Sequence, residues 1–147
     1  MTDRESERTG GSAPAEPAFS GRRLLLAEDN PVNMKIARLI LTQAGFSVET
    51  AENGRVAVDM VSASEPGYYD AILMDMQMPV MDGCEAARAI RALRKRELAE
   101  IPIAALTANV FPEDVEAAGA AGMVAHIAKP VDAETLLAAL RGMLARR

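Results

Sequence analysis

The chain is poor in the residues that crosslink proteins or build aromatic cores. Its 147 residues include one cysteine, one histidine, two tyrosines, three phenylalanines and no tryptophan. The single cysteine, Cys84, cannot form an internal disulfide, so we expect a reducing, cytoplasmic compartment. Hydrophobic residues still make up 50% of the chain, which is enough for one domain with an aliphatic core.

Long apolar runs and a positive net charge are also missing. No segment approaches the roughly 20 apolar residues that a membrane span needs, and the N-terminus lacks the apolar centre of a secretory signal. The net charge of -5 and the pI of about 4.9 argue against general binding to nucleic acid. We therefore expect a monomer or weak dimer that binds neither membranes nor nucleic acid.

The first part of the chain has too few apolar residues to fold by itself. Residues 2–23 contain no leucine, isoleucine or valine and are rich in glycine, serine, proline, glutamate and arginine. Such a segment cannot bury enough surface to offset the entropy lost on ordering. We predict a disordered tail or linker over residues 1–21 and one folded domain over residues 22–147.

Beyond the tail, short aliphatic runs alternate with helical patterns. Strands are expected at residues 23–27, 46–51, 69–74, 101–106 and 123–128. A helix is expected after each strand, with Pro31 and Pro112 in first turns and Asp82 and Asp132 as caps. Repeated strand–helix units in one short domain predict the α/β class, with a doubly wound, five-stranded parallel sheet and five helices.

Polar side chains stand where four of the expected strands end. Glu28 and Asp29 follow the first strand, Asp75 the third, Thr107 the fourth and Lys129 the fifth. In an open parallel sheet, ligands bind at this edge. Carboxylate oxygens suit Mg²⁺, and carboxylates crowded together without a cation would raise one another's pKa. The set can therefore hold a divalent cation and a phosphoryl group.

Four motifs at these strand ends carry a resemblance to a known family. In chain order they are Glu28-Asp29-Asn30-Pro31-Val32-Asn33, Met74-Asp75-Met76-Gln77-Met78-Pro79-Val80-Met81-Asp82-Gly83, Ala105-Leu106-Thr107-Ala108-Asn109 and Lys129-Pro130-Val131. The chain resembles the response-regulator receiver domain over about residues 22–147, and most of all the receivers attached to hybrid histidine kinases. The resemblance implies a flavodoxin-like fold with strand order 2-1-3-4-5.

The resemblance also implies a Mg²⁺-dependent phosphoacceptor. Asp75 would accept a phosphoryl group from a histidine kinase or a histidine phosphotransfer protein. Asp29, Asp75 and the backbone carbonyl of Gln77 would bind Mg²⁺ directly, and Glu28 would do so through water. Thr107 would contact the phosphoryl oxygens and then move the loop that follows it.

The last motif is expected to complete the site. Lys129 would place a second positive charge against the phosphoryl oxygens, on the side opposite the metal. The sharp turn into the last helix and the family resemblance favour a cis peptide bond between Lys129 and Pro130.

Other functions fit parts of the same pattern. The chain could be a free-standing regulator or part of a hybrid kinase, with output by protein contact. A phosphohydrolase that forms an aspartyl phosphate is an alternative, but its general acid or base would stand where this chain has Gln77. A degenerate receiver that only binds partners is a further alternative, and such domains usually lose residues that this chain keeps. Taken alone, Asp75 could cap a loop, and Glu28-Asp29 could cap a helix.

Several surface features have plain interpretations. The basic residues between Arg88 and Arg96 are expected on one helix, as a solvated outer face. His126 stands where many receivers have tyrosine or phenylalanine, and it is expected to be half-exposed. Met76 and Met78 could be buried or could form a docking rim around the acceptor.

Two apolar stripes are expected on the first helix. The inner stripe is predicted as Ile36, Leu39 and Ile40, and the outer one as Val32, Met34, Ala37 and Leu41. We expect the outer stripe to dock a helix of the phosphodonor protein.

Overall fold

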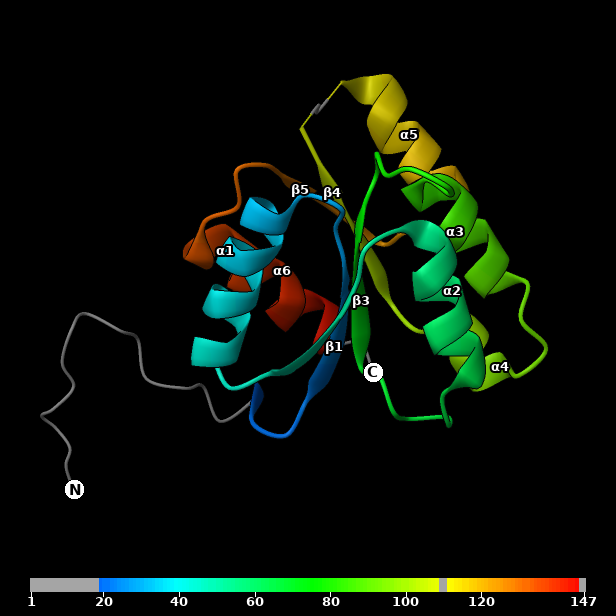
Figure 1. The fold of residues 1–147 in the computed structure, drawn as a ribbon, viewed down its shortest axis with the longest axis horizontal. Coiled ribbons are helices and arrows are strands. Elements are labelled where there is room, and N and C mark those ends of the chain that lie inside the picture. Colours follow the sequence, from blue (N-terminus) through cyan, green and yellow to red (C-terminus); the bar gives the residue numbers. More distant parts are fainter. Residues whose placement is uncertain (1–18, 109–110, 146–147) are drawn as a thin grey trace, which may run out of the picture.

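The computed structural model describes residues 19–108 and 111–145. Its centre is a five-stranded parallel sheet with the order β2-β1-β3-β4-β5, as the sequence predicted (Figure 1). The strands are β1 (Arg23–Ala27), β2 (Ser47–Ala51), β3 (Ala71–Asp75), β4 (Ile103–Thr107) and β5 (Ala125–Ala128). The last three strands each begin two residues later than expected, and β3 and β4 extend far enough to include Asp75 and Thr107.

Helices cover both faces of the sheet. They are α1 (Pro31–Gln43), α2 (Gly54–Ala63), α3 (Gly83–Arg91), α4 (Arg96–Ala99), α5 (Pro112–Ala120) and α6 (Ala133–Leu144). Helices α1 and α6 lie on one face, and α2, α3, α4 and α5 lie on the other (Figure 1). Five helices were expected, and the additional α4 is a single turn. Within the described ranges, no helix has both the length and the apolar character needed to cross a bilayer.

The central strands carry the core because both of their faces are covered. Every residue of β3 and β4 is buried. Leu25 and Ile72 belong to the cluster under α2 and α3, whereas Leu24 and Leu73 belong to the cluster under α1 and α6. This alternation places successive side chains in two separate apolar layers, and it explains why these strands read as continuous aliphatic runs.

The prediction for the two stripes of α1 was wrong in part: Val32 is exposed and Ile40 packs against the core, as expected, but four other residues are exchanged between the stripes. Ala37 and Leu41 are buried against the sheet, while the side chains of Ile36 and Leu39 are 46% and 56% exposed. Val32 is 64% exposed and continues the outer stripe. Both stripes have helical spacing, so periodicity could not choose between them. In the structure, Ala37 and Leu41 pack against the sheet, in the core cluster under α1 and α6.

The basic segment after residue 88 is not one solvated helix. Helix α3 ends at Arg91, and the Arg91 guanidinium turns inward. It donates hydrogen bonds to the carbonyl oxygens of Gly122 (2.7 and 3.0 Å), Ala99 (2.8 Å) and Ile101 (2.7 Å). Burial lowers the pKa of Arg91. Arg91 therefore ties the segments that lead into β4 and β5 to the end of α3.

The ordered domain begins before residue 22. Phe19 is only 1% exposed and belongs to the core cluster under α1 and α6. Residues 1–18 lie outside the described part of the chain, so the tail or linker expected there remains a prediction.

Removing the Arg91 clamp should destabilise the fold. We expect Arg91→Leu to lower the free energy of unfolding by about 2–4 kcal/mol, because three carbonyl groups in partly buried hydrogen bonds lose their donors. The exposed residue Arg94 gives a matched control, and Arg94→Leu should stay within about 0.5 kcal/mol of wild type. Urea unfolding of both variants measures the difference. Equal stabilities would contradict a structural role for Arg91.

Candidate functional site

The candidate site lies at the carboxyl end of the sheet. Register pairs Asp75 on β3 with Leu106 on β4, and Thr107 on β4 with Ala128 on β5, so these strands end side by side. One open pocket at this edge contains every site residue that the sequence predicted. Its lining residues are Glu28, Asp29, Asn30, Asn33, Asp75, Met76, Gln77, Thr107, Ala108 and Lys129.

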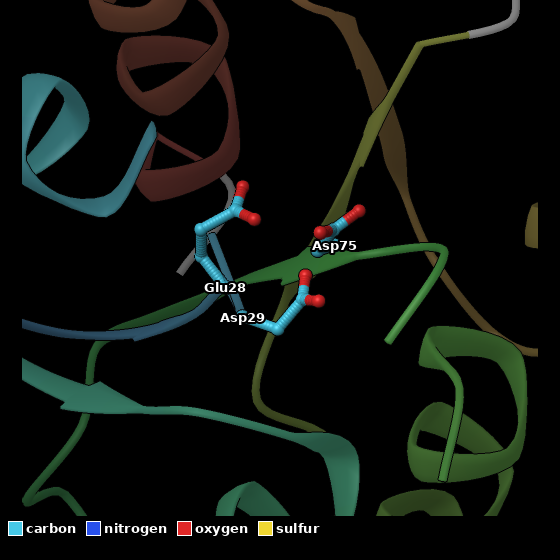
Figure 2. Close-up of side chains that lie close together, drawn as sticks. All are labelled: Glu28, Asp29 and Asp75. Carbon is cyan, nitrogen blue, oxygen red and sulfur yellow. The ribbon is translucent and has the colours of Figure 1, made fainter. Parts of the chain in front are cut away.

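Three carboxylates converge in this pocket. One oxygen from each of Glu28, Asp29 and Asp75 lies within 4.8 Å of the others (Figure 2). Glu28 and Asp75 are 2% and 3% exposed, whereas Asp29 faces solvent. Glu28 and Asp29 come from the end of β1 and Asp75 from β3, so adjacent parallel strands bring the acids together.

A single ammonium group bridges the two buried carboxylates. Lys129 Nζ lies 2.9 Å from Glu28 Oε1 and 3.0 Å from Asp75 Oδ2. The remaining oxygens accept backbone hydrogen bonds: Asn30 N–H donates to Glu28 Oε2 (3.1 Å), and Gln77 N–H donates to Asp75 Oδ1 (3.2 Å). Both carboxylates are thus held in position, but two buried negative charges share one positive charge.

The pKa shifts reflect this imbalance. Burial raises the pKa of Asp75, and the neighbouring Glu28 raises it further, against the lowering effect of Lys129 and the Gln77 N–H. Burial alone would lower the pKa of Lys129, but hydrogen bonds and charge interactions with both carboxylates raise it overall. The ammonium group therefore stays charged, while the ionised form of Asp75 is disfavoured.

Local sequence explains how the acids are presented. Asn30 caps α1, because its side-chain oxygen accepts hydrogen bonds from the N–H groups of Val32 and Asn33. Gly83 begins α3 directly against β3, and a Cβ atom there would lie 2.3 Å from the Asp75 carbonyl oxygen. Only glycine permits this approach. Sequence reasoning missed the packing role of Gly83.

Other expectations at the site had mixed outcomes. The Lys129–Pro130 peptide bond is cis, as predicted. Met78 is buried and Met76 packs partly against the core, so burial is the better account of both. His126 is partly buried, as expected, but its Nε2 atom is fully enclosed and has no hydrogen-bond partner in the described part of the chain.

The donor set suits a hard divalent cation. The three converging acids offer carboxylate oxygens, which Mg²⁺ prefers, and these lie close enough to share one ion. Gln77 also lines the pocket, on the segment that follows Asp75. A divalent cation there would balance the charge that Lys129 leaves uncompensated.

Comparison with known proteins identifies the family. The family model described as "Response regulator receiver domain" matches residues 24–141. The chain therefore belongs to the response regulator receiver domain family, as its motifs predicted. The two-component response regulator ORR41 of Oryza sativa subsp. japonica is 44% identical over 117 residues, covering 78% of this chain and 87% of that protein.

Solved structures and longer relatives agree with this assignment. A receiver domain of the sensor histidine kinase PA1611 from Pseudomonas aeruginosa PAO1, solved with a magnesium ion in its active-site cleft, is 38% identical with a TM-score of 0.76. The match covers 86% of this chain and 99% of that one. Hybrid signal transduction histidine kinase I of Dictyostelium discoideum is 35% identical over 130 residues, which cover 87% of this chain but only 8% of the kinase. The chain thus spans a small part of such curated relatives.

Loss of Lys129 should make stability strongly pH-dependent. Without metal and near neutral pH, Lys129→Met should destabilise the fold by about 2–4 kcal/mol, because two buried carboxylates lose their counter-charge. The pKa of Asp75 is already raised and should rise further in the variant. The folded state then binds more protons than the unfolded state, so its stability recovers as the pH falls toward the ordinary carboxyl range and is lost as the pH rises.

Thermal unfolding in a chelator across this pH range measures the effect. Lys35→Met, which removes an exposed lysine of α1, is the control and should track wild type at each pH. A Lys129→Met deficit that stays constant with pH would contradict this account.

Proposed function

We propose that this chain is a phosphorelay receiver that accepts a phosphoryl group on Asp75 from a phosphohistidine protein. The observation that carries the proposal is the placement of Asp75. Its buried carboxylate lies beside two other acids and 3.0 Å from the Lys129 ammonium, within an open pocket. A small anionic group entering this pocket would meet a nucleophile and a fixed positive charge together.

The transfer exchanges one bond to phosphorus for another. A carboxylate oxygen of Asp75 forms the O–P bond while the P–N bond of the phosphohistidine breaks, and the imidazole nitrogen leaves with the bonding electrons. Lys129 neutralises charge on the phosphoryl oxygens, and the backbone N–H of Gln77 holds the carboxylate in orientation. Catalysis would therefore consist of positioning and charge stabilisation.

Magnesium fits the remaining part of the pocket. Asp29 and Asp75 would bind it directly, together with the backbone carbonyl of Gln77, and Glu28 would act through water. When bound, the ion screens the repulsion between the carboxylate and the incoming phosphoryl group.

Phosphorylation would change the charge at Asp75, next to the end of β4. The acyl phosphate carries nearly one more negative charge than the carboxylate that it replaces. Thr107 ends β4, lines the same pocket and is buried, and its hydroxyl would donate a hydrogen bond to the new oxygens. Output would then pass by protein contact through the loop that follows Thr107.

The donor would dock on the exposed stripe of α1. Val32, Ile36 and Leu39 form this stripe, which begins next to the acid pair. Ile36 also lines an apolar hollow with Pro130 and Val131, beside Lys129. Exposed apolar residues at helical spacing favour an amphipathic helix as partner. The partner would be a histidine kinase or a histidine phosphotransfer protein.

The alternatives have less support. A phosphohydrolase needs a general acid or base near the acyl phosphate, and the Gln77 side chain cannot serve. A degenerate receiver would have no reason to hold three acids and a lysine in one pocket. We therefore infer a signalling module with self-catalysed phosphorylation rather than a conventional enzyme. It would act in the cytoplasm, alone or within a hybrid kinase.

Asp75 should be the only labelled residue. With acetyl phosphate and Mg²⁺, the wild-type chain should gain the mass of one phosphoryl group, and Asp75→Asn should gain none. Asp59→Asn, which changes an exposed acid of α2, is the control and should label normally. Intact-mass spectrometry measures the product. Labelling of Asp75→Asn to the wild-type extent would overturn the proposed function.

Docking can be separated from chemistry with two donors. Ile36→Glu should slow transfer from a phosphohistidine protein at least about tenfold, because it places a charge in the apolar contact. It should leave acetyl-phosphate labelling unchanged, since that donor needs no docking surface. Val56→Glu on α2 is the control, because Val56 is similarly accessible on the other side of the sheet. Equal slowing with both donors would mean that the effect lies in folding or chemistry.

A further inference from the structure

The segment before β1 is held by an aromatic contact at the end of the domain remote from Asp75. Phe19 is among the largest fully buried side chains of the described part of the chain. Its ring stacks on Phe46 with the centroids 4.5 Å apart, and the Arg141 guanidinium lies 5.8 Å from its centre. Phe46 comes from the α1–β2 turn and Arg141 from α6. Phe19 therefore connects the segment before β1 to α6 and to the turn that follows α1.

A tight turn directs Phe19 into this position. Arg22 N–H donates to the Phe19 carbonyl oxygen at 3.0 Å, which closes a four-residue turn. Gly21 has a φ of 81°, a conformation that glycine adopts without strain. Arg22 is held in turn, because its carbonyl accepts from Ser47 N–H at 2.9 Å. The residues between Phe19 and β1 are thus fixed at both ends.

We propose that Phe46, Arg141 and the apolar cluster beneath them form a socket for the segment that precedes the domain, with Phe19 as its anchoring residue. Phe19 lies outside residues 24–141, which the family model matches, whereas Phe46 and Arg141 lie within them. The strand that follows runs from the socket to the acid pair, a span of about 17 Å for five residues. Phe19 therefore lies at the end of β1 opposite the acid pair.

This anchoring has a consequence for how the receiver is presented. A flexible linker would let the domain rotate freely about residue 22, whereas the socket holds residues 19–22 against the domain. The socket also involves the turn that ends α1, the helix that carries the exposed stripe Val32, Ile36 and Leu39. The pocket and this stripe then keep a fixed orientation relative to the point where the preceding chain emerges.

The test uses the full chain and the variant Phe19→Ala. We expect its Tm to fall by about 5–10 °C, because a large buried side chain is lost. Hydrogen exchange at the amides of residues 20–23 should rise at least about tenfold, and trypsin should cleave faster after Arg22. Phe19→Leu, which keeps an apolar anchor, should give intermediate values if the alanine variant does not fold.

Phe111→Ala serves as the matched control, because the Phe111 side chain is 60% exposed. It should leave both exchange at residues 20–23 and cleavage after Arg22 unchanged. A fall in Tm for Phe19→Ala with wild-type exchange and cleavage would mean that the ring only fills the core. That result would overturn the socket, as would wild-type values for all three measurements.

Discussion

The arrangement at the carboxyl end of the sheet depends on one electrostatic imbalance. Glu28 and Asp75 are buried side by side and share the single ammonium of Lys129. At a few ångströms, two like charges near a protein surface repel by several kcal/mol. The pair of carboxylates therefore has an unfavourable electrostatic energy, which a further positive charge would lower. Burial and the neighbouring Glu28 also raise the pKa of Asp75, so a divalent cation bound here would relieve an unfavourable charge. If Glu28 and Asp75 were exposed to water, the repulsion between their carboxylates would be much weaker.

The fold is what makes this crowding possible. Three different strands end in the residues involved, and parallel crossovers return every strand to the same edge. Close approach of the elements then fixes the distances. Gly83 lets α3 begin against the Asp75 carbonyl, and Asn30 begins α1 directly after the acid pair. Backbone N–H groups at these junctions hold the carboxylates in place, so little needs to reorganise when a ligand binds.

Much of this could be predicted from sequence, because strand ends and helix caps are local signals. The order of elements, the class of fold and most residues of the pocket followed from aliphatic runs that end in polar side chains, whereas Gln77 and the strand order followed from the family resemblance. The features that could not be predicted are those where local patterns are ambiguous. Both stripes of α1 have helical spacing, and only the sheet selects Ala37 and Leu41. Arg91 looked like its solvated basic neighbours, because its acceptors lie outside its own helix, one of them 31 residues away at Gly122. Phe19 was assigned to a tail because its surroundings are polar, although one aromatic ring is enough to anchor a turn.

These features divide the domain into a reactive end and an anchored end. At the reactive end, buried charges are poorly balanced and apolar side chains of α1 stay exposed, so both are placed to gain free energy from a partner. At the other end, the Phe19 ring stacks on Phe46, and Arg91 donates a hydrogen bond to the Ile101 carbonyl oxygen. The strands connect the two ends rigidly, because both faces of β3 and β4 are packed. Under the proposed function, a phosphoryl group on Asp75 would therefore be accommodated least easily by the packed strands β3 and β4, and any response would be confined to the carboxyl edge of the sheet.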